Sequence, residues 1–375
     1  MFGTGGSAVV AAKIGQEKQE EANRNFSALT LTTLIIGILG AVLGNLFCRQ
    51  ICSLLGATPV LMDYGTAYLR TILSFAPVCL LQALFQSFFV TAGRPGLGLS
   101  LTVSAGITNM LLDYLFVVPL HLGVAGAALA TGLGQCIPAV AGILYFTFAR
   151  KGLRFTRPEF SKGLLSTSCF NGSSEMVSNL SGSLVGILYN IQLMAIAREN
   201  GVSAYGVLMY VDFIFKAFFF GYSIAVTPVV GYHYGAQNHA ELKSLLRKSL
   251  IITVLASLLM TGGAIVLAGP IADLFVGYDA ALHDMTVNAL RIYSVSFLVF
   301  GFNIFGSAFF TGLNDGTDSA LISFLRTLVF QVAAILLLPR WLDINGIWLA
   351  VTAAESLTLL VTVSLLAAKR RKYHY

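Results

Sequence analysis

The sequence repeats itself at a spacing of about 220 residues, and this repeat constrains the fold more than any other feature. Single matches of Gly or Leu are common, but a run of matches at one spacing, with Pro and Thr included, indicates a duplicated unit. The second copy starts near residue 160, so we expect the first copy to lack its opening helix and part of the next. The matched pairs, 220 or 221 residues apart, include Gly15 and Gly235, Leu69-Arg70 and Leu290-Arg291, Gln82 and Asn303, Thr91 and Thr311, and Pro119 and Pro339.

The repeated unit is built from long apolar runs. The chain is 56% hydrophobic and only 11% charged, whereas soluble domains carry roughly 25% charged residues. A membrane-spanning helix needs about 20 mostly apolar residues, and such runs follow one another here. Because the bilayer offers no water to satisfy backbone groups, spanning segments are helices or closed barrels. The runs lack strict alternation and exceed the roughly 10 residues of a barrel strand, so helices are expected.

These runs predict an all-α membrane protein of two helical lobes. We expect a half-span ending near residue 12, a lobe over 1–150, a basic linker over 151–162, a second lobe over 163–368 and a basic tail over 369–375. An even number of spans in each full copy makes the two lobes parallel repeats, an arrangement typical of transporters. The full spans are expected near 28–55, 64–92, 96–118, 123–149, 166–197, 203–230, 244–269, 285–312, 318–338 and 345–368.

The basic residues report topology rather than a nucleic-acid partner. A net charge of +6 would suit nucleic acid, but most Lys and Arg residues lie in alternate loops, which is the positive-inside pattern. We therefore expect a multi-pass protein of the cell inner (plasma) membrane with a cytoplasmic C-terminus. The five Cys residues lie in or beside apolar runs without metal or disulfide spacing, and Cys48 and Cys52 are expected on one face of a helix.

Asp113 is the clearest candidate for chemistry, because an ionisable group inside a span costs roughly 2.5–3.5 kcal/mol on insertion scales. Asn109 precedes it by one helical turn on the same face, and Thr131 on the following helix adds a hydroxyl. These three groups can hold Na⁺, or the carboxylate can hold a proton; a structural hydrogen bond between helices is the alternative. Their partners 220 residues later are Val329, Ala333 and Val351, which favours a task specific to the first lobe.

A second set of polar residues lies in the span near 166–197. A polar stripe in a membrane helix faces protein or a water-filled cavity, so we predict cation binding for Glu175 and a substrate cavity lined by the rest, together with the repeat pair Gln82 and Asn303. Interhelical packing is the alternative. The stripe consists of Asn171, Glu175 and Asn179, spaced every four residues, and Asn190 and Gln192 extend it.

Other signals point away from enzymatic chemistry. Asp212 and Lys216, four residues apart, are expected to neutralise each other, and Glu355, which stands at the repeat position of Gln135, is a weaker candidate. The glycines after Thr91 resemble a phosphate loop, but no strand precedes them and a short turn is expected. The sequence contains no Walker-type motif, no clustered Asp-rich metal motif and no hydrolase constellation, so we expect a protein that is not an enzyme and has no cofactor.

Four passages resemble the multidrug and toxic compound extrusion (MATE) family, and in particular its bacterial MepA-like branch. Each motif is loose alone, but their order and spacing, together with the six-plus-six repeat, are fairly specific and cover essentially the whole chain. The passages are Phe2–Gly6 continuing to Lys13-Ile14-Gly15, then Gly93-Arg94-Pro95 followed by Asn109–Asp113, then Asn171–Glu175 with Asn179, and finally Pro228–Ala236.

The resemblance implies a secondary antiporter that exports organic cations or other amphipathic compounds in exchange for H⁺ or Na⁺, as a monomer. In that family an Asn and an Asp on the fifth helix and a Thr on the sixth form a cation site, which Asn109, Asp113 and Thr131 match. The family's acid on the seventh helix matches Glu175. An acid of the first helix completes the site in much of the family, and the repeat predicts that this helix is missing here.

Two other functions stay open at the level of sequence. One is a lipid-linked saccharide flippase of the same superfamily, which would need a more cationic central cavity than the few mid-span bases provide. The other is an inactive fragment truncated at its N-terminus.

Overall fold

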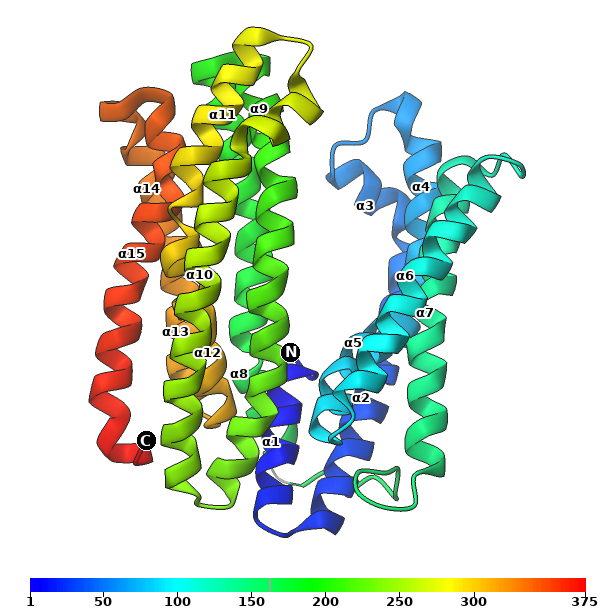
Figure 1. The fold of residues 1–375 in the computed structure, drawn as a ribbon. Helices are drawn as coiled ribbons and strands as arrows, with labels where there is room; N and C mark the ends of the chain where they lie inside the picture. The colour runs from blue at the N-terminus through cyan, green and yellow to red at the C-terminus, as the bar shows by residue number, and fades with distance from the viewer. Residues whose placement is uncertain (162) are drawn as a thin grey trace. The chain divides into compact units, whose positions relative to one another are not determined.

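The structure is a computed structural model that describes residues 1–161 and 163–375. Two compact units form: an N-terminal unit of Phe2–Ser166 and a C-terminal unit of Met1 and Thr167–Tyr375 (Figure 1). Within the described residues all regular elements are helices, so the predicted all-α fold class is confirmed. Lys162, which the predicted linker included, lies outside the described residues.

The N-terminal unit begins with a short helix and continues with the predicted run of spans. Its elements are α1 (Thr4–Gly15), α2 (Gln19–Leu46), α3 (Cys48–Leu54), α4 (Pro59–Ser74), α5 (Ala76–Thr91), α6 (Pro95–Val117) and α7 (Gly123–Phe148).

The C-terminal unit begins with α8 and the first half of α9, and its later helices then follow the same order as those of the N-terminal unit. Its elements are α8 (Leu164–Asn171, which begins just before the boundary), α9 (Ser173–Gly235), α10 (His239–Val276), α11 (Ala280–Ser294), α12 (Phe297–Gly312), α13 (Gly316–Phe324), the π-helix η1 (Leu325–Phe330), α14 (Gln331–Leu337) and α15 (Pro339–Tyr373).

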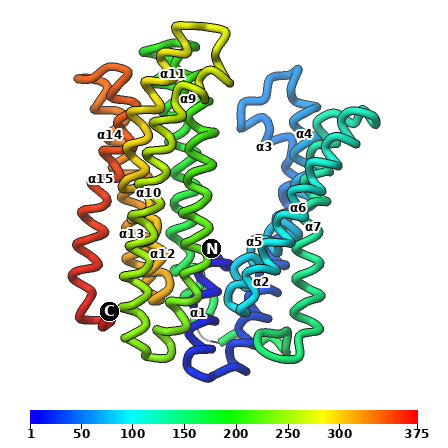
Figure 2. Tube along the Cα trace, viewed as in Figure 1, coloured from blue at the N-terminus to red at the C-terminus, as the bar shows by residue number. Residues whose placement is uncertain are grey.

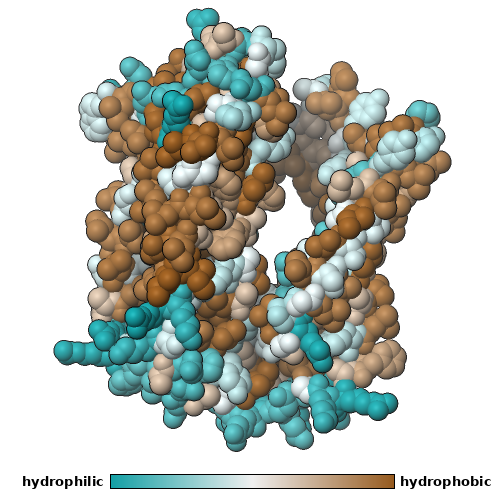
Figure 3. All heavy atoms as spheres, viewed as in Figure 1, coloured by the Kyte–Doolittle hydropathy of each residue, from teal (hydrophilic) through white to brown (hydrophobic). Residues whose placement is uncertain are grey.

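Among the described residues, seven helices are long and apolar enough to cross a membrane, or up to nine if each of two bent pairs counts as one span. The bent pairs are α4 with α5, at 51°, and α11 with α12, at 46° (Figure 2). The 63-residue helix α9 is broken by the non-helical backbone of Arg198. It contains most of the span predicted over 166–197, whose first residues lie in α8, and all of the span predicted over 203–230. Figure 3 shows the apolar side chains that such spans require along the C-terminal unit, with hydrophilic ones at its ends.

The span predicted over 28–55 is wrong in its bounds. Helix α2 begins nine residues earlier, at Gln19, and ends at Leu46, because its polar first turns are held by hydrogen bonds that hydropathy alone does not reveal. A separate helix, α3, then carries Cys48 and Cys52, which are both buried. The prediction that these two cysteines share one helical face is confirmed.

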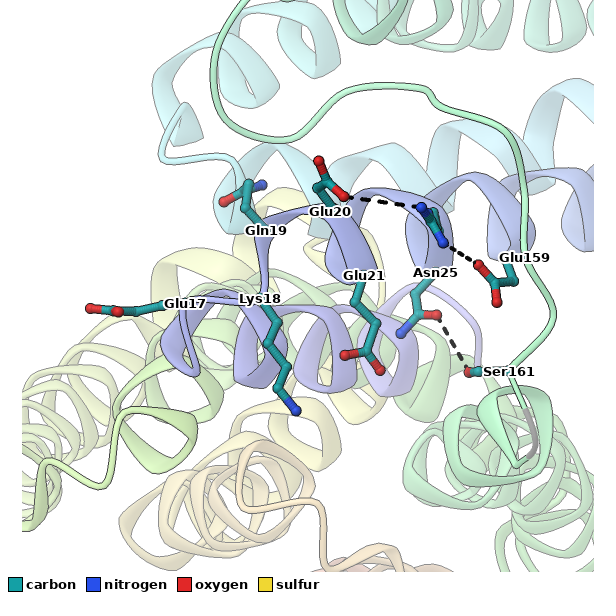
Figure 4. Close-up of a pocket in the computed structure, with 9 residues that line it drawn as sticks. Glu17, Lys18, Gln19, Glu20, Glu21, Asn25, Glu159 and Ser161 are labelled. Carbon is teal, nitrogen blue, oxygen red and sulfur yellow. Dashed lines mark hydrogen bonds and ion pairs between the residues drawn. The ribbon is translucent and has the colours of Figure 1, made fainter.

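The polar start of α2 is bound by the linker that follows α7 (Figure 4). Phe155 of the linker also stacks on Phe26, with ring centroids 5.0 Å apart. These contacts fix the linker along α2 within the N-terminal unit. The bonds are those of Arg154 N to Asn23 Oδ1 (3.2 Å), Thr156 N to Ser27 Oγ (2.9 Å), Arg24 Nη1 to Glu159 Oε2 (2.6 Å) and Ser161 Oγ to Asn25 Oδ1 (3.4 Å).

The backbone itself carries the repeat. Residues with positive φ recur at the spacing of the sequence repeat, at the turns and kinks where the chain changes direction. The amide of Lys18 bonds to the carbonyl of Lys13, and that of Asn238 bonds to His233, so the two turns also share their hydrogen bonds. The recurring pairs are Glu17 (φ 62°) and Gln237 (φ 54°), Gly93 (φ 70°) and Asn314 (φ 59°), and Gly123 (φ 56°) and Asp343 (φ 47°).

Candidate functional site

Helices α6 and α7 bring two of the predicted site residues together. The side-chain amide of Asn109 donates a hydrogen bond to the Thr131 hydroxyl at 3.4 Å. Gly134 makes this close approach possible, because a Cβ at that position would lie 3.2 Å from Cβ of Asn109 and 3.0 Å from the carbonyl oxygen of Ala105. The glycine-rich sequence of α7 therefore positions the hydroxyl of Thr131 against α6.

The oxygen atoms at this junction are available to a cation. The Thr131 hydroxyl donates its one proton to the carbonyl of Ala127 at 3.0 Å, so its lone pairs face other groups. The Asn109 amide can present either its nitrogen or its oxygen to a neighbour. Asp113 follows one turn later on α6, and its Oδ1 is buried without a hydrogen-bond partner among the described residues.

A buried carboxylate oxygen without a donor is costly. Binding a proton or a small hard cation removes this cost, and carboxylate, amide and hydroxyl oxygens are the ligands that such cations take. The described part of the chain contains no group of three or more His, Cys, Asp or Glu side chains that could hold a metal ion. Asn109, Asp113 and Thr131 thus offer oxygen atoms and a single acid on two adjacent helices, and their role as a cation site stays a prediction.

The predicted polar stripe of the next span is interrupted. A break at Gly172 separates α8 from α9, so Asn171 does not continue the helical face of Glu175 and Asn179. Asn171 is buried and donates to Asn314 Oδ1 at 2.7 Å. The expectation of one uninterrupted stripe that starts at Asn171 is therefore wrong, because this amide joins α8 to the α12–α13 turn.

The remaining residues of the stripe lie on the first half of α9. Glu175 is half-buried, with its Oε2 3.5 Å from the amino group of Met1. Asn179 and Asn190 are exposed, Gln192 is partly buried, and the Asn190 amide donates to the carbonyl of Gly186 at 2.9 Å. Exposed amides in an apolar helix suit a water-filled path better than lipid, and their role in a substrate cavity stays a prediction.

The repeat pair Gln82 and Asn303 lies in different surroundings in its two units. Gln82 is partly buried on α5, whereas Asn303 on α12 has no exposed surface. The Asn303 amide donates to Glu355 Oε2 at 2.7 Å and to the Glu355 carbonyl at 2.8 Å, and its Oδ1 accepts from Thr362 at 2.9 Å. Asn303 thus lies inside a hydrogen-bond network rather than at an open cavity.

Glu355 belongs to a set of four charged side chains in the C-terminal unit, which we call the charge cluster: Asp212, Arg326 and Glu355, which are buried, and Lys216, which is partly buried. Lys216 Nζ lies 2.8 Å from Asp212 Oδ2, so the predicted neutralisation of this pair is confirmed. Arg326 Nε lies 3.8 Å from Glu355 Oε1, which is an ion pair but too long for a hydrogen bond. Two acids and two bases leave the cluster neutral, as burial in an apolar helix bundle requires.

One aromatic ring joins the two ion pairs. The Phe300 ring centroid lies 4.5 Å from Lys216 Nζ and 5.2 Å from Arg326 Cζ, so both cations lie against the same ring. Tyr293 donates its hydroxyl to Asp212 Oδ1 at 2.9 Å. Arg326 itself lies in η1, and π-helical turns inside α-helices occur frequently at functional sites.

Sequence reasoning missed the cluster as a unit because its members come from three helices that are far apart in the sequence, α9, η1 and α15. It also missed Gln135, one turn after Thr131 on α7, whose Oε1 is buried without a partner among the described residues. The repeat alignment held a signal for it, since Gln135 occupies the position of Glu355.

Comparison with known proteins agrees with this architecture. The sequence matches the family profile MatE over residues 1–115 and 176–336. The multidrug export protein MepA of Staphylococcus haemolyticus is 21% identical over 376 residues, covering 99% of this chain and 82% of that protein. MepA of Staphylococcus aureus strain MRSA252 is 20% identical, covering 97% and 80%.

Solved structures share the fold. An outward-facing multidrug resistance MATE family transporter of the MOP superfamily matches with a TM-score of 0.94 at 22% identity, covering 100% of this chain and 84% of that one. A MOP superfamily transporter from Pyrococcus furiosus, described as having a binding pocket of reverse polarity, matches with a TM-score of 0.93 at 22% identity and the same coverage. At this identity the likeness concerns the fold alone.

Proposed function

Because this chain belongs to the MatE family of transporters, we propose that it is a secondary antiporter that exports small organic cations or other amphipathic compounds in exchange for H⁺ or Na⁺. The relatives named multidrug export proteins support the substrate class. The observation that carries the coupling is the buried Asp113 Oδ1, which has no hydrogen-bond partner among the described residues and lies one turn from Asn109, itself bonded to Thr131. The antiporter acts as a monomer in this proposal.

In the proposed cycle Asp113 alternates between binding the driving ion and releasing it. With H⁺ the carboxyl becomes neutral, and with Na⁺ the oxygens of Asn109 and Thr131 add to the carboxylate. An ion shifts the equilibrium between inward-open and outward-open states only through a difference in affinity for the two states. Rearrangement of α6 against α7, which changes the distance between these oxygens, is a sufficient source of that difference.

The basic ends of the helices give the proposed orientation. Lys243 and Arg247 begin α10, and Lys369–Lys372 end α15. By the positive-inside rule this end is cytoplasmic, so the C-terminus and the linker face the cytoplasm. Substrate then leaves toward the opposite face, with the driving ion moving inward.

The test is transport by the purified full chain in liposomes with an imposed H⁺ or Na⁺ gradient and a fluorescent organic cation as substrate. Asp113→Asn should reduce gradient-driven transport at least about 100-fold, consistent with the loss of a group that acts in every cycle. Asp63→Asn removes an exposed acid of α4 and serves as the matched control, with transport unchanged. Gradient-driven transport that persists in Asp113→Asn overturns the assignment.

A further inference from the structure

A groove at the basic end of the C-terminal unit lies outside the ion site and the charge cluster. It has a volume of about 700 Å³ and is lined by the start of α10 and the end of α15. Figure 2 shows these two chain segments at the same end of the unit. The lining contains three bases, Lys243, Arg247 and Arg370, and no acid.

None of the three bases of the groove forms an ion pair with an Asp or Glu side chain of the described residues. Lys243 and Arg247 are exposed and form no ion pair within residues 1–161 and 163–375. Arg370 donates its Nε to the carbonyl of Tyr375 at 3.2 Å, which uses one donor of its guanidinium. By contrast, Lys369 on the same helix lies 3.0 Å from Asp318 Oδ2. At the end of α15, Lys369 therefore pairs with the acids beside the α12–α13 turn, whereas Arg370 lines the groove without an acidic side chain as its partner.

Beyond the bases the groove becomes apolar along the direction of the helices. Leu250 on α10 and Val363 and Leu359 on α15 line it. Arg370 and Leu359 are eleven residues apart, which corresponds to about 16 Å of helix at 1.5 Å per residue. One leaflet contributes about 15 Å to a hydrocarbon core of about 30 Å. The lining thus runs from a cationic end to an apolar end over the depth of one leaflet.

We propose that this groove binds one anionic phospholipid of the cytoplasmic leaflet. The phosphate lies between Lys243, Arg247 and Arg370, and an acyl chain lies along Leu250, Val363 and Leu359. A free phosphate would use only the cationic end and leave the apolar wall without an occupant. Basic pockets between membrane helices on the cytoplasmic side are known to recognise acidic head groups. The proposal rests on the membrane orientation given above and is independent of the ion site.

The test is native mass spectrometry of the full chain in detergent, titrated with phosphatidylglycerol and, separately, with phosphatidylcholine of the same acyl chains. We expect one phosphatidylglycerol to bind at least about tenfold more tightly than phosphatidylcholine. The variant Lys243→Gln/Arg247→Gln/Arg370→Gln should lose this preference, because the affinity for phosphatidylglycerol should fall about fivefold for each base removed. The control Lys151→Gln/Lys248→Gln/Arg371→Gln removes equal charge from exposed positions outside the lining and should retain the preference.

A second variant fills the groove without changing its charge. Val363→Trp should reduce binding of phosphatidylglycerol at least about tenfold, because the larger side chain occupies the path of the acyl chain. Equal affinity for the two lipids, loss of preference in the control, or unchanged binding in Val363→Trp overturns the proposal. Displacement of the lipid by inorganic phosphate also overturns it, since the groove would then be a site for free anions.

Discussion

Asp113 in the N-terminal unit and Glu355 in the C-terminal unit are both acids within apolar helices, yet their surroundings are opposite. Glu355 is 4% exposed, accepts from Asn303 and lies beside Arg326. Asp113 has a buried oxygen without a hydrogen-bond partner among the residues that the structure describes. The difference teaches that burial alone does not mark a candidate functional acid: Glu355 is held by partners within the fold, whereas the Asp113 oxygen has none among the described residues.

The repeat makes this contrast sharper. At the position of Glu355 the N-terminal unit has Gln135, and at the position of Asp113 the C-terminal unit has Ala333. Each unit therefore has an acid where the other has none. The two copies of one architecture thus differ in the acids within their helices, since Glu355 lies in the charge cluster and Asp113 does not have such partners among the described residues.

The largest expected effect is on stability and separates the two acids directly. Glu355→Leu should destabilise the protein by about 3–5 kcal/mol, because it leaves Arg326 as a buried charge without its partner. Asp113→Leu should cost less than about 1 kcal/mol, since no protein group loses a bond. Denaturant unfolding in detergent, followed by circular dichroism, measures both values.

A double variant controls for the loss of packing. Arg326→Met/Glu355→Leu removes both charges and should recover most of the stability that Glu355→Leu loses, as replacement of a buried pair by apolar residues often does. A double variant as unstable as Glu355→Leu would show that packing, and not the unpaired charge, produced the effect.

A smaller effect is expected from the hydroxyl that supports Asp212. Tyr293→Phe removes a hydrogen bond to a buried carboxylate and should cost about 1.5–3 kcal/mol. Tyr210→Phe is the matched control, because this exposed tyrosine stacks on Phe275 and its variant should stay within about 0.5 kcal/mol. Equal unfolding free energies for the two variants would contradict the role of Tyr293 in the charge cluster.

The two units also differ at one helix cap. Asp315 precedes α13 and accepts from the backbone of Asp318 at 3.4 Å, whereas its repeat partner Arg94 precedes α6 without a side-chain cap. Arg94→Asp should therefore stabilise the N-terminal unit by about 0.5–1 kcal/mol, since it supplies a cap and an anion at a helix N-terminus. Thermal unfolding measures the gain, and the control Arg94→Leu should give none.

The smallest effect concerns acid pH. Burial raises the pKa of Asp315, but the Tyr373 hydroxyl, the Asp318 amide, Lys372 and Lys369 together outweigh it and hold that pKa below its ordinary value. A lowered native pKa contributes stability that is complete above the unfolded value of about 3.9 and disappears as the pH falls through the native value. Between pH 5 and about pH 3, wild type should lose more stability than Asp315→Asn; parallel curves would contradict this.

Periodicity and the repeat predicted the fold well, because apolar runs and turn positions are local properties of the sequence. Most helices lie within a few residues of the predicted spans, and the Asp212–Lys216 pair follows from its spacing alone. The start of α2 could not be predicted from the sequence, since Asn23 and Ser27 are bound by linker residues more than 120 positions away.

The candidate site could be predicted only in part. Asn109 and Asp113 share a helical face and Thr131 lies on the next helix, so sequence spacing was sufficient to group them. The charge cluster was not predictable in the same way, because Arg326 reaches Glu355 only after η1 and α15 pack together. The interruption at Gly172 was likewise hidden, since a spacing of four residues between Asn171 and Glu175 assumes a continuous helix.

The bends of the two split spans occur with and without a proline. Both occur at matching places, at Phe75 and at Ser296, with angles of 51° and 46°. Only the first is followed by a helix-breaking residue, Pro77, whose counterpart is Leu298. The bend therefore occurs in both units although only one of them has the proline. A chimaera that exchanges residues 59–91 with residues 280–312 should keep both bends. We expect this because packing against the surrounding helices, and not the exchanged residues, maintains each bend.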